Sequence, residues 1–255
     1  LRCRHALMLL AGNTTLADVA ADRGFADQSH LPRTLPPDTR LLPFSNIYPC
    51  NWLQVYENIM DHMHTAVLHN HMVVEGVDAA TSAGVSLEGF GDMPVMQWEA
   101  TRDGNGCVFI ASRRLPGDKI WVRITEMVFP NYLQIGSLLP TAARERHGTA
   151  GCTRWCVPVD DENMIIFGYR HFNSTVDPDG LGNEADCGVD KIDFLEGQTG
   201  NRSYDEGQRA PGDWEAIVSQ GRIAAHGAAH PGISDVGVYM GRKLLPNAVQ
   251  DKTAP

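Results

Sequence analysis

The chain has 255 residues, of which 43% are hydrophobic and 20% are charged, and this composition favours a folded domain over a disordered chain. No apolar run approaches the ~18 residues that a membrane-spanning helix needs, so a membrane protein is not expected. The formal net charge of −10 argues against broad neutralisation of nucleic-acid phosphates. The 6 cysteines are scattered and no signal peptide precedes them, which predicts reduced thiols and a cytoplasmic location.

Residues 1–33 predict short helices. An apolar run ends at Gly12, Thr14 or Thr15 can cap a second helix, and Gly24 closes that helix. The stretch ALMLLAGNTTLADVAADRGFADQSHLPR resembles a helix-turn-helix of AraC-type transcription regulators. Such regulators use two of these motifs, whereas here the Pro-rich segment 34–40 follows the first and predicts a linker. We therefore interpret residues 1–33 as a remnant that binds no DNA alone.

The remainder, residues 41–255, mixes two kinds of pattern. Runs rich in β-branched and aromatic residues predict strands at 108–111, 120–125, 153–158, 164–169 and 236–239. Amphipathic segments predict helices at 53–69 and 214–220, and the polar stretch 173–211 is expected to run over the surface. Together these patterns predict an α+β fold in which one antiparallel sheet carries helices.

A candidate metal site lies in the first predicted helix, where Asp61, His64 and His69 follow one another with spacings of three and five residues. Two neutral imidazoles and a carboxylate can hold a divalent transition metal. On a regular helix, however, five positions turn His69 away from His64 by about 140°. The two histidines can share a metal only if the helix ends or bulges between them, and otherwise they are solvated or core histidines.

Four blocks of sequence carry a more specific resemblance. CNWLQVYENIMDHMHTAVLH (50–69) resembles the iron-binding helix of Rieske-type non-heme iron oxygenases, in particular their phthalate and phenoxybenzoate-like branch. RWCVPVDDENMIIFGYRHFN (154–173) looks like a sheet segment of that family, and PGDWEAIVSQGRIA (211–224) looks like its iron-carboxylate helix. HPGISDVGVYMGRKLL (230–245) looks like its closing strand and C-terminal helix. The resemblance implies a helix-grip (START-like) fold, with an antiparallel sheet wrapped around helices.

The same resemblance implies a set of site residues. His64, His69 and Asp213 match the two histidines and the carboxylate that hold mononuclear Fe(II), leaving positions for O₂ and substrate. Asp61 matches the acidic residue that links the iron site to a Rieske cluster on the neighbouring subunit. Asn58 stands where the family often has an amide close to the iron.

Other acidic and histidine residues have simpler interpretations. His62 replaces a proline of many relatives and is interpreted as a surface histidine. Asp213 could instead cap the helix that follows it. Asp235 is a rival third ligand but fits a turn, and Asp160 and Asp161 fit a hairpin turn. The expected walls of an apolar pocket are Met60, Val67, Phe109, Phe167 and Val238.

The cluster ligands of the family are not visible in this sequence. A Rieske [2Fe-2S] cluster takes a C-x-H and a later C-x2-H, and Cys3-Arg4-His5 supplies only the first half. Cys152 and Cys156 have the wrong spacing and are interpreted as buried thiols.

The resemblance therefore implies an oxygenase catalytic domain that inserts O₂-derived oxygen into an aromatic substrate, with electrons from a reductase and a Rieske domain in trans. Relatives of this family often form threefold rings, so a homotrimer is one possible assembly, and the sequence leaves the oligomeric state open. The alternatives are an AraC-type regulator that senses an aromatic ligand, and an inactive ligand-binding domain.

Overall fold

The structure is a computed structural model, and it describes residues 37–69, 93–101, 104–115, 119–136, 150–174, 184–191 and 197–250. The predicted helix-turn-helix at 1–33 lies outside these ranges. The last residue of the predicted linker, Arg40, is already the first residue of a strand.

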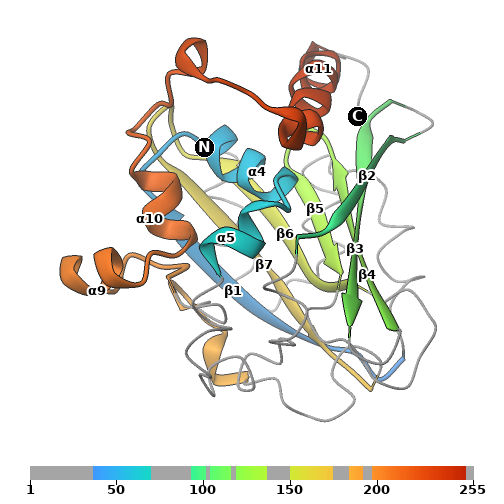
Figure 1. Ribbon diagram of the computed structural model, residues 1–255. Coiled ribbons are helices and arrows are strands. Elements are labelled where there is room, and N and C mark those ends of the chain that lie inside the picture. The colour runs from blue at the N-terminus through green and yellow to red at the C-terminus, as the bar shows by residue number, and fades with distance from the viewer. Residues whose placement is uncertain are drawn as a thin grey trace.

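Seven antiparallel strands form one sheet in the order β1-β7-β6-β5-β4-β3-β2 (Figure 1). The strands are β1 (Arg40–Tyr48), β2 (Val95–Ala100), β3 (Gly106–Leu115), β4 (Lys119–Val128), β5 (Tyr132–Gly136), β6 (Ala150–Pro158) and β7 (Met164–Phe172). The β6–β7 hairpin brings Arg154 opposite Gly168 and Cys156 opposite Ile166. Pro43 lies in β1, where a missing N–H is tolerated because β1 is an edge strand.

The helices lie on one face of this sheet, as Figure 1 shows for α4, α5, α10 and α11. The α-helices of the described ranges are α4 (Trp52–Met60), α5 (His64–Leu68), α9 (Tyr204–Arg209), α10 (Asp213–Val218) and α11 (Val236–Gln250). Short 3-10 turns are η1 (Glu184–Asp186), η2 (His226–Ala228) and η3 (Ile233–Asp235). Helix α4 contacts β6, α10 and α11, and α11 also contacts β2 and β3. The α+β class and the helix-grip arrangement that the sequence predicts are thereby confirmed.

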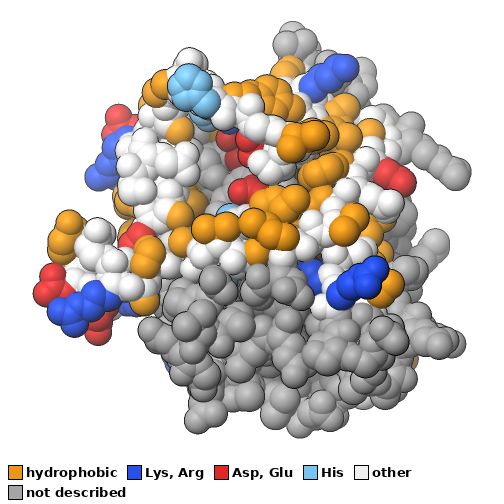
Figure 2. All heavy atoms as spheres, viewed as in Figure 1, with side chains coloured by type: hydrophobic (Ala, Val, Ile, Leu, Met, Phe, Trp, Pro, Cys, Tyr) orange, Lys and Arg blue, Asp and Glu red, His pale blue; other side chains and the backbone are white. Residues whose placement is uncertain are grey.

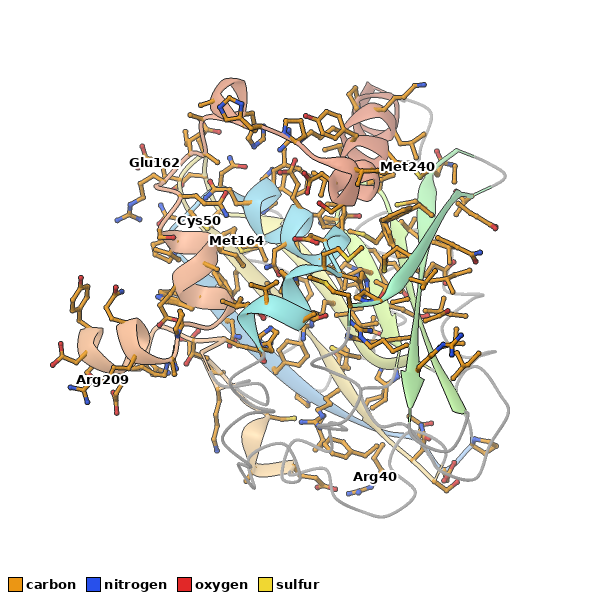
Figure 3. All side chains as sticks on the ribbon, viewed as in Figure 1. Arg40, Cys50, Glu162, Met164, Arg209 and Met240 are labelled. Carbon is orange, nitrogen blue, oxygen red and sulfur yellow. The ribbon has the colours of Figure 1, made fainter. Side chains whose placement is uncertain are left out.

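The main hydrophobic core lies between the helices and the sheet. Met164 of β7 and Cys50, both labelled in Figure 3, are fully buried there, and Met240 of α11 packs against the same cluster. A second, smaller cluster contains Trp155 and Phe167. Side chains alternate along a strand, so Ile166 of the main core and Phe167 of the second cluster lie on opposite faces of the sheet. The expectation that Phe167 lines the same pocket as Phe109 is therefore wrong.

The strand predicted at 236–239 is also wrong, because these residues begin helix α11. Val236, Val238 and Tyr239 give the local sequence a strand-like composition. Gly237 and Gly241 favour the helix instead, because each packs closely against a side chain of another element. A Cβ on Gly237 would lie 2.3 Å from Trp98 Nε1, and one on Gly241 would lie 2.4 Å from Met60 Sδ. Glycine at these positions lets the helix approach β2 and α4 closely, and this tertiary contact overrides local preference.

Four of the predicted strands are confirmed within β3, β4, β6 and β7, while β1, β2 and β5 were not predicted. The described cysteines, Cys50, Cys107, Cys152, Cys156 and Cys187, are all free thiols, and Cys152 and Cys156 are buried as predicted. Within the described ranges, no helix has the length and apolarity that crossing a membrane requires.

Candidate metal centre

The helix predicted at 53–69 is broken by the turn that Asp61 forms. Helix α4 is capped by Asn51, whose side chain accepts a hydrogen bond from Leu53 N, and it ends at Met60. The Asp61 carboxylate then accepts hydrogen bonds from the backbone N–H groups of Met63 (2.8 Å) and His64 (3.3 Å). Short acidic side chains compete with helix hydrogen bonds in this way. The chain therefore restarts as α5 at His64.

This break in the helix allows His64 and His69 to approach each other, although their five-residue spacing would turn them apart on one regular helix. Helix α5 is only five residues long and ends at Leu68, so His69 lies just beyond its end. The helix thus ends between His64 and His69, and their rings approach to 5.6 Å between centroids. Both histidines face the carboxylate of Asp213, the first residue of α10. The Nε2 atoms of His64 and His69 each lie 3.4 Å from Asp213 Oδ1.

These three side chains could hold one metal ion, because their ligand atoms all lie within 4.8 Å of one another. Two ligand atoms at about 2.1 Å from one ion and at right angles to each other would be about 3 Å apart. The two distances of 3.4 Å from the histidine nitrogens to Asp213 are close to this value. The alternative interpretation of Asp213 as a helix cap is wrong. Gly212 is the cap residue of α10, and its N–H is bound by the Glu215 carboxylate at 2.8 Å.

The electrostatics of the cluster are those of a buried ion pair. Burial alone would raise the pKa of Asp213, but the imidazoles of His69 and His64 hold that pKa well below its usual range. Burial opposes the charge on His64, whereas the carboxylates of Asp213 and Asp61 raise its pKa above the ordinary value. A carboxylate that is ionised among imidazoles is ready to bind a cation.

Residues around the cluster orient its ligands. The Nδ1–H of His64 donates to the carbonyl of Asp61, which leaves Nε2 facing Asp213 and free for a metal. Asn58 Nδ2 lies 3.5 Å from Asp213 Oδ1, so the predicted amide is beside the cluster. The structure thus brings all five predicted site residues into one neighbourhood.

One orienting residue was not predicted. Gln198 donates from Nε2 to Asp213 Oδ2 at 3.2 Å, and its carbonyl accepts from Tyr48 Oη (2.8 Å) and Asn46 Nδ2 (3.2 Å). Gln198 and its neighbour Thr199 are buried, which corrects the expectation that 173–211 runs over the surface throughout. The only signal in the sequence was the short run Gly197-Gln198-Thr199, which carries no charge within a polar segment.

His62 also departs from its prediction, because it is buried rather than on the surface. Burial, with help from the charges of Arg123, His64 and Arg113, holds the pKa of His62 well below its usual range. The interpretation of Asp235 and Asp160 as turn residues is confirmed. The Asp235 carboxylate accepts from Gly232 N at 2.6 Å, and Asp160 accepts from Glu162 N at 2.8 Å in the β6–β7 turn.

A small cavity adjoins the cluster on the side of Asp213. Its polar lining consists of Asn46, Tyr48, Asn58, Arg154, Gln198 and Asp213, and its apolar lining consists of Phe44, Val55, Ile59, Ile166 and Ile217. Figure 2 shows acidic and histidine atoms within a hollow of the face that carries the helices, with hydrophobic side chains around it. The expected wall residue Met60 is buried and Val238 packs against the core, whereas Val67 is 68% exposed.

Two relatives of known name are similar to this chain. It is 58% identical over 222 residues to the "tert-butanol monooxygenase / tert-amyl alcohol desaturase oxygenase subunit" of Aquincola tertiaricarbonis, across 87% of this chain and 47% of that protein. It is 32% identical over 205 residues to "phenoxybenzoate dioxygenase subunit alpha" of Ectopseudomonas oleovorans, across 79% of this chain and 43% of that protein. The homologues are therefore oxygenase subunits, in agreement with the resemblance that the four sequence blocks carry.

The chain spans less than half the length of either relative. No protein-family model matches it. Among solved structures, a dicamba monooxygenase bound to 3,6-dichlorosalicylic acid has a TM-score of 0.46 at 12% identity, covering 88% of this chain and 64% of that one.

Proposed function

We propose that this chain is the catalytic region of a Rieske-type non-heme iron oxygenase, in which His64, His69 and Asp213 hold one Fe(II) ion. The convergence of these three ligands, from segments that lie far apart in a chain with oxygenase homologues, carries the proposal. Two imidazoles and one carboxylate are the ligand set of non-heme iron oxygenases, and they leave coordination positions open. When bound, the iron supplies the site at which O₂ is activated.

The residues of the chain would then do three separate things. Asp61 holds the Nδ1–H of His64 and so fixes which ring nitrogen faces the metal. Gln198 and Asn58 place donors beside the Asp213 carboxylate and keep it turned toward the histidines. The hydrophobic side chains around the cavity, among them Ile59 and Ile217, exclude water from the position next to the metal.

Electron supply is the second part of the proposal. Oxygenation by such a site needs two electrons, and we infer that they come from a reductase through a Rieske [2Fe-2S] centre carried in trans. Asp61 lies between α4 and α5, is partly exposed, and is bonded to His64 through its carbonyl. This position supports the proposal that Asp61 links the metal site to a donor that docks on this face, for example in a threefold ring.

The proposed substrate is taken from the name of the more similar relative. A protein that is 58% identical is named for tert-butanol and tert-amyl alcohol, so we propose oxygenation of a small tertiary alcohol for this chain. The aromatic substrate that the sequence resemblance implies, and that the phenoxybenzoate dioxygenase name supports for the more distant relative, is the competing candidate.

The test is the iron content after anaerobic reconstitution with Fe(II) and desalting. We expect close to one iron per chain in the wild type and only trace iron in Asp213→Ala. Asp160→Ala, which removes an exposed carboxylate from the β6–β7 turn, is the matched control and should bind iron like the wild type. Equal trace amounts in wild type and Asp213→Ala would refute the iron site and leave the inactive ligand-binding domain as the better description.

If iron is bound, the same preparation is given a reductase and a Rieske protein in trans, with tert-butanol or an aryl ether as substrate. Oxygenated alcohol supports the proposed substrate class. Oxygenated aryl ether with unchanged alcohol supports the aromatic candidate.

A further inference from the structure

Asp213 supplies the carboxylate of the metal cluster from the start of a very short helix. Helix α10 is six residues long, and Asp213 is its first residue. Isolated helices of this length are unstable in water, so the first turn of α10 depends on contacts with the rest of the chain. Any movement of this turn would carry the carboxylate away from His64 and His69.

The segment Gly197–Arg202, which we call the clamp, runs along the start of α10. The carbonyl of Gly197 accepts a hydrogen bond from the backbone N–H of Trp214 at 2.7 Å. The next residue, Gln198, donates from Nε2 to Asp213 Oδ2 at 3.2 Å. The first of these bonds holds the backbone beside the metal ligand, and the second holds its side chain.

Arg202 fastens the far end of the clamp to the same part of the chain. Its Nη1 donates to the carbonyl of Ala210 at 2.9 Å, and its Nη2 donates to Glu215 Oε2 at 2.6 Å. The same Glu215 oxygen accepts from the N–H of Gly212 at 2.8 Å. One guanidinium therefore holds the chain on both sides of Asp213. The Arg202 and Glu215 side chains are only 17% and 18% exposed, so water screens this ion pair less than it screens an exposed one.

Gly197 allows these groups to pack in contact. Its φ of +73° lies in the left-handed region that favours glycine. A Cβ at this position would lie 2.4 Å from Arg202 Nη2 and 2.7 Å from Gly212 Cα. The guanidinium therefore lies where the backbone of the clamp meets the residue that precedes Asp213.

We propose that Arg202 is a positioning residue, which acts through Glu215 to hold Asp213 in its ligating position before the metal arrives. A ligand that is already ordered loses less conformational freedom on binding, so the metal is bound more tightly. This inference rests on the proposed function, because it takes Asp213 as a ligand of Fe(II). Loss of the Arg202–Glu215 ion pair should therefore lower metal affinity by more than its effect on overall stability explains.

The experiment measures Fe(II) affinity of the full 255-residue chain anaerobically, by competition with a chromophoric chelator. Arg202→Leu should bind Fe(II) about tenfold more weakly, the lower end of the usual effect of removing a group that orients a metal ligand. Arg242→Leu is the matched control, because Arg242 forms a comparable ion pair with Glu57, with bonds of 2.6 and 2.7 Å, that joins α11 to α4. The control should bind Fe(II) like the wild type, even where urea denaturation shows an equal loss of stability.

Variants of Glu215 separate positioning from a general structural role. Glu215→Gln keeps an oxygen that accepts from Gly212 and Arg202, so it should restore most of the affinity that Glu215→Leu loses. The double variant Arg202→Leu/Glu215→Leu should bind Fe(II) no more weakly than Glu215→Leu alone, because both substitutions remove the same link.

The inference is overturned if Arg202→Leu binds Fe(II) like the wild type, if Arg242→Leu loses as much affinity, or if the effects of the two single substitutions add in the double variant. Failure of the proposed function would look different, because the wild type itself would then bind no Fe(II). Hydrogen exchange of the iron-free chain would still test the clamp. The N–H of Trp214 should exchange faster in Arg202→Leu than in the wild type and in Arg242→Leu, and equal exchange in all three would refute the clamp.

Discussion

The two faces of the sheet use buried histidines in opposite ways. On the helix-covered face, His62 has no partner on either ring nitrogen, and His64 and His69 share the carboxylate of Asp213. On the opposite face, His171 of β7 has a partner on each nitrogen, Thr153 Oγ1 at 2.9 Å and the carbonyl of Ala150 at 2.8 Å. Buried polar groups with all their partners stabilise a fold, whereas a buried group without partners requires a separate explanation, such as a functional role. The chemistry is thus confined to one face, and the other face serves stability.

The aromatic cluster of the opposite face gives the largest expected effect. Trp155 is 7% exposed and stacks on Phe167 at 5.5 Å between centroids, with Tyr132 at 5.4 Å. Trp155→Ala removes this packing, and we expect the free energy of unfolding to fall by about 3–5 kcal/mol, measured by urea denaturation. Iron content of the folded variant should stay at the wild-type level. Loss of iron without loss of stability would contradict the division between the two faces.

The second prediction uses the pH dependence of His171. Burial lowers the pKa of His171 from 6.5 to about 4 in the folded chain, while the unfolded chain keeps the ordinary value. The unfolded chain then binds more protons between these values, so stability is complete above pH 6.5 and is lost as the pH falls toward about 4. The loss amounts to about 3 kcal/mol.

The measurement is the free energy of unfolding of wild type and His171→Gln at several pH values from 7.5 down to 4. The variant should lose less stability over this range, because it has no imidazole to protonate at this position. His230→Gln, on the exposed loop, should follow the wild type. A variant whose profile falls as steeply as the wild type would show that His171 does not carry this dependence.

The contrast between the faces also explains which features the sequence could predict. Strands β3, β4, β6 and β7 could be predicted because their β-branched and aromatic residues lie in continuous runs. Edge strand β2, with Gln97 and Glu99 exposed to solvent, has no such run. Only the first residues of helix α11, 236–239, were predicted as a strand, because their conformation depends on the close contacts of Gly237 and Gly241 with distant residues, which no local pattern reports.

The residues of the candidate site also divide into those that the sequence could predict and those that it could not. His64, His69, Asp213, Asp61 and Asn58 could be proposed from their sequence blocks, because each block is local. Gln198 and the burial of His62 could not be proposed, because both follow from long-range packing. Gln198 reaches Asp213 only because Tyr48 and Asn46 of β1 bind its carbonyl, across more than 140 residues of sequence.

Two glutamines, buried Gln198 on one face and half-buried Gln134 on the other, give the smallest and most selective prediction. Gln198 donates to Asp213 Oδ2 on the helix-covered face, and Gln134 donates to Thr153 Oγ1 at 3.3 Å on the other. Gln198→Leu should weaken Fe(II) affinity about 10- to 100-fold, the usual effect of removing a group that orients a metal ligand. The carboxylate would then turn more freely, while the backbone carbonyl of residue 198 keeps its bonds to β1.

Gln134→Leu is the matched control, since it removes the same amide from the opposite face. Fe(II) affinity of both variants can be measured anaerobically by competition with a chromophoric chelator. We expect Gln134→Leu to bind Fe(II) like the wild type and Gln198→Glu, which keeps an oxygen but adds a charge beside Asp213, to perturb the affinity as well. If Gln198→Leu and Gln134→Leu bind Fe(II) equally, Asp213 is held by its place in α10 alone, and the polar groups of the helix-covered face do not act together on the metal.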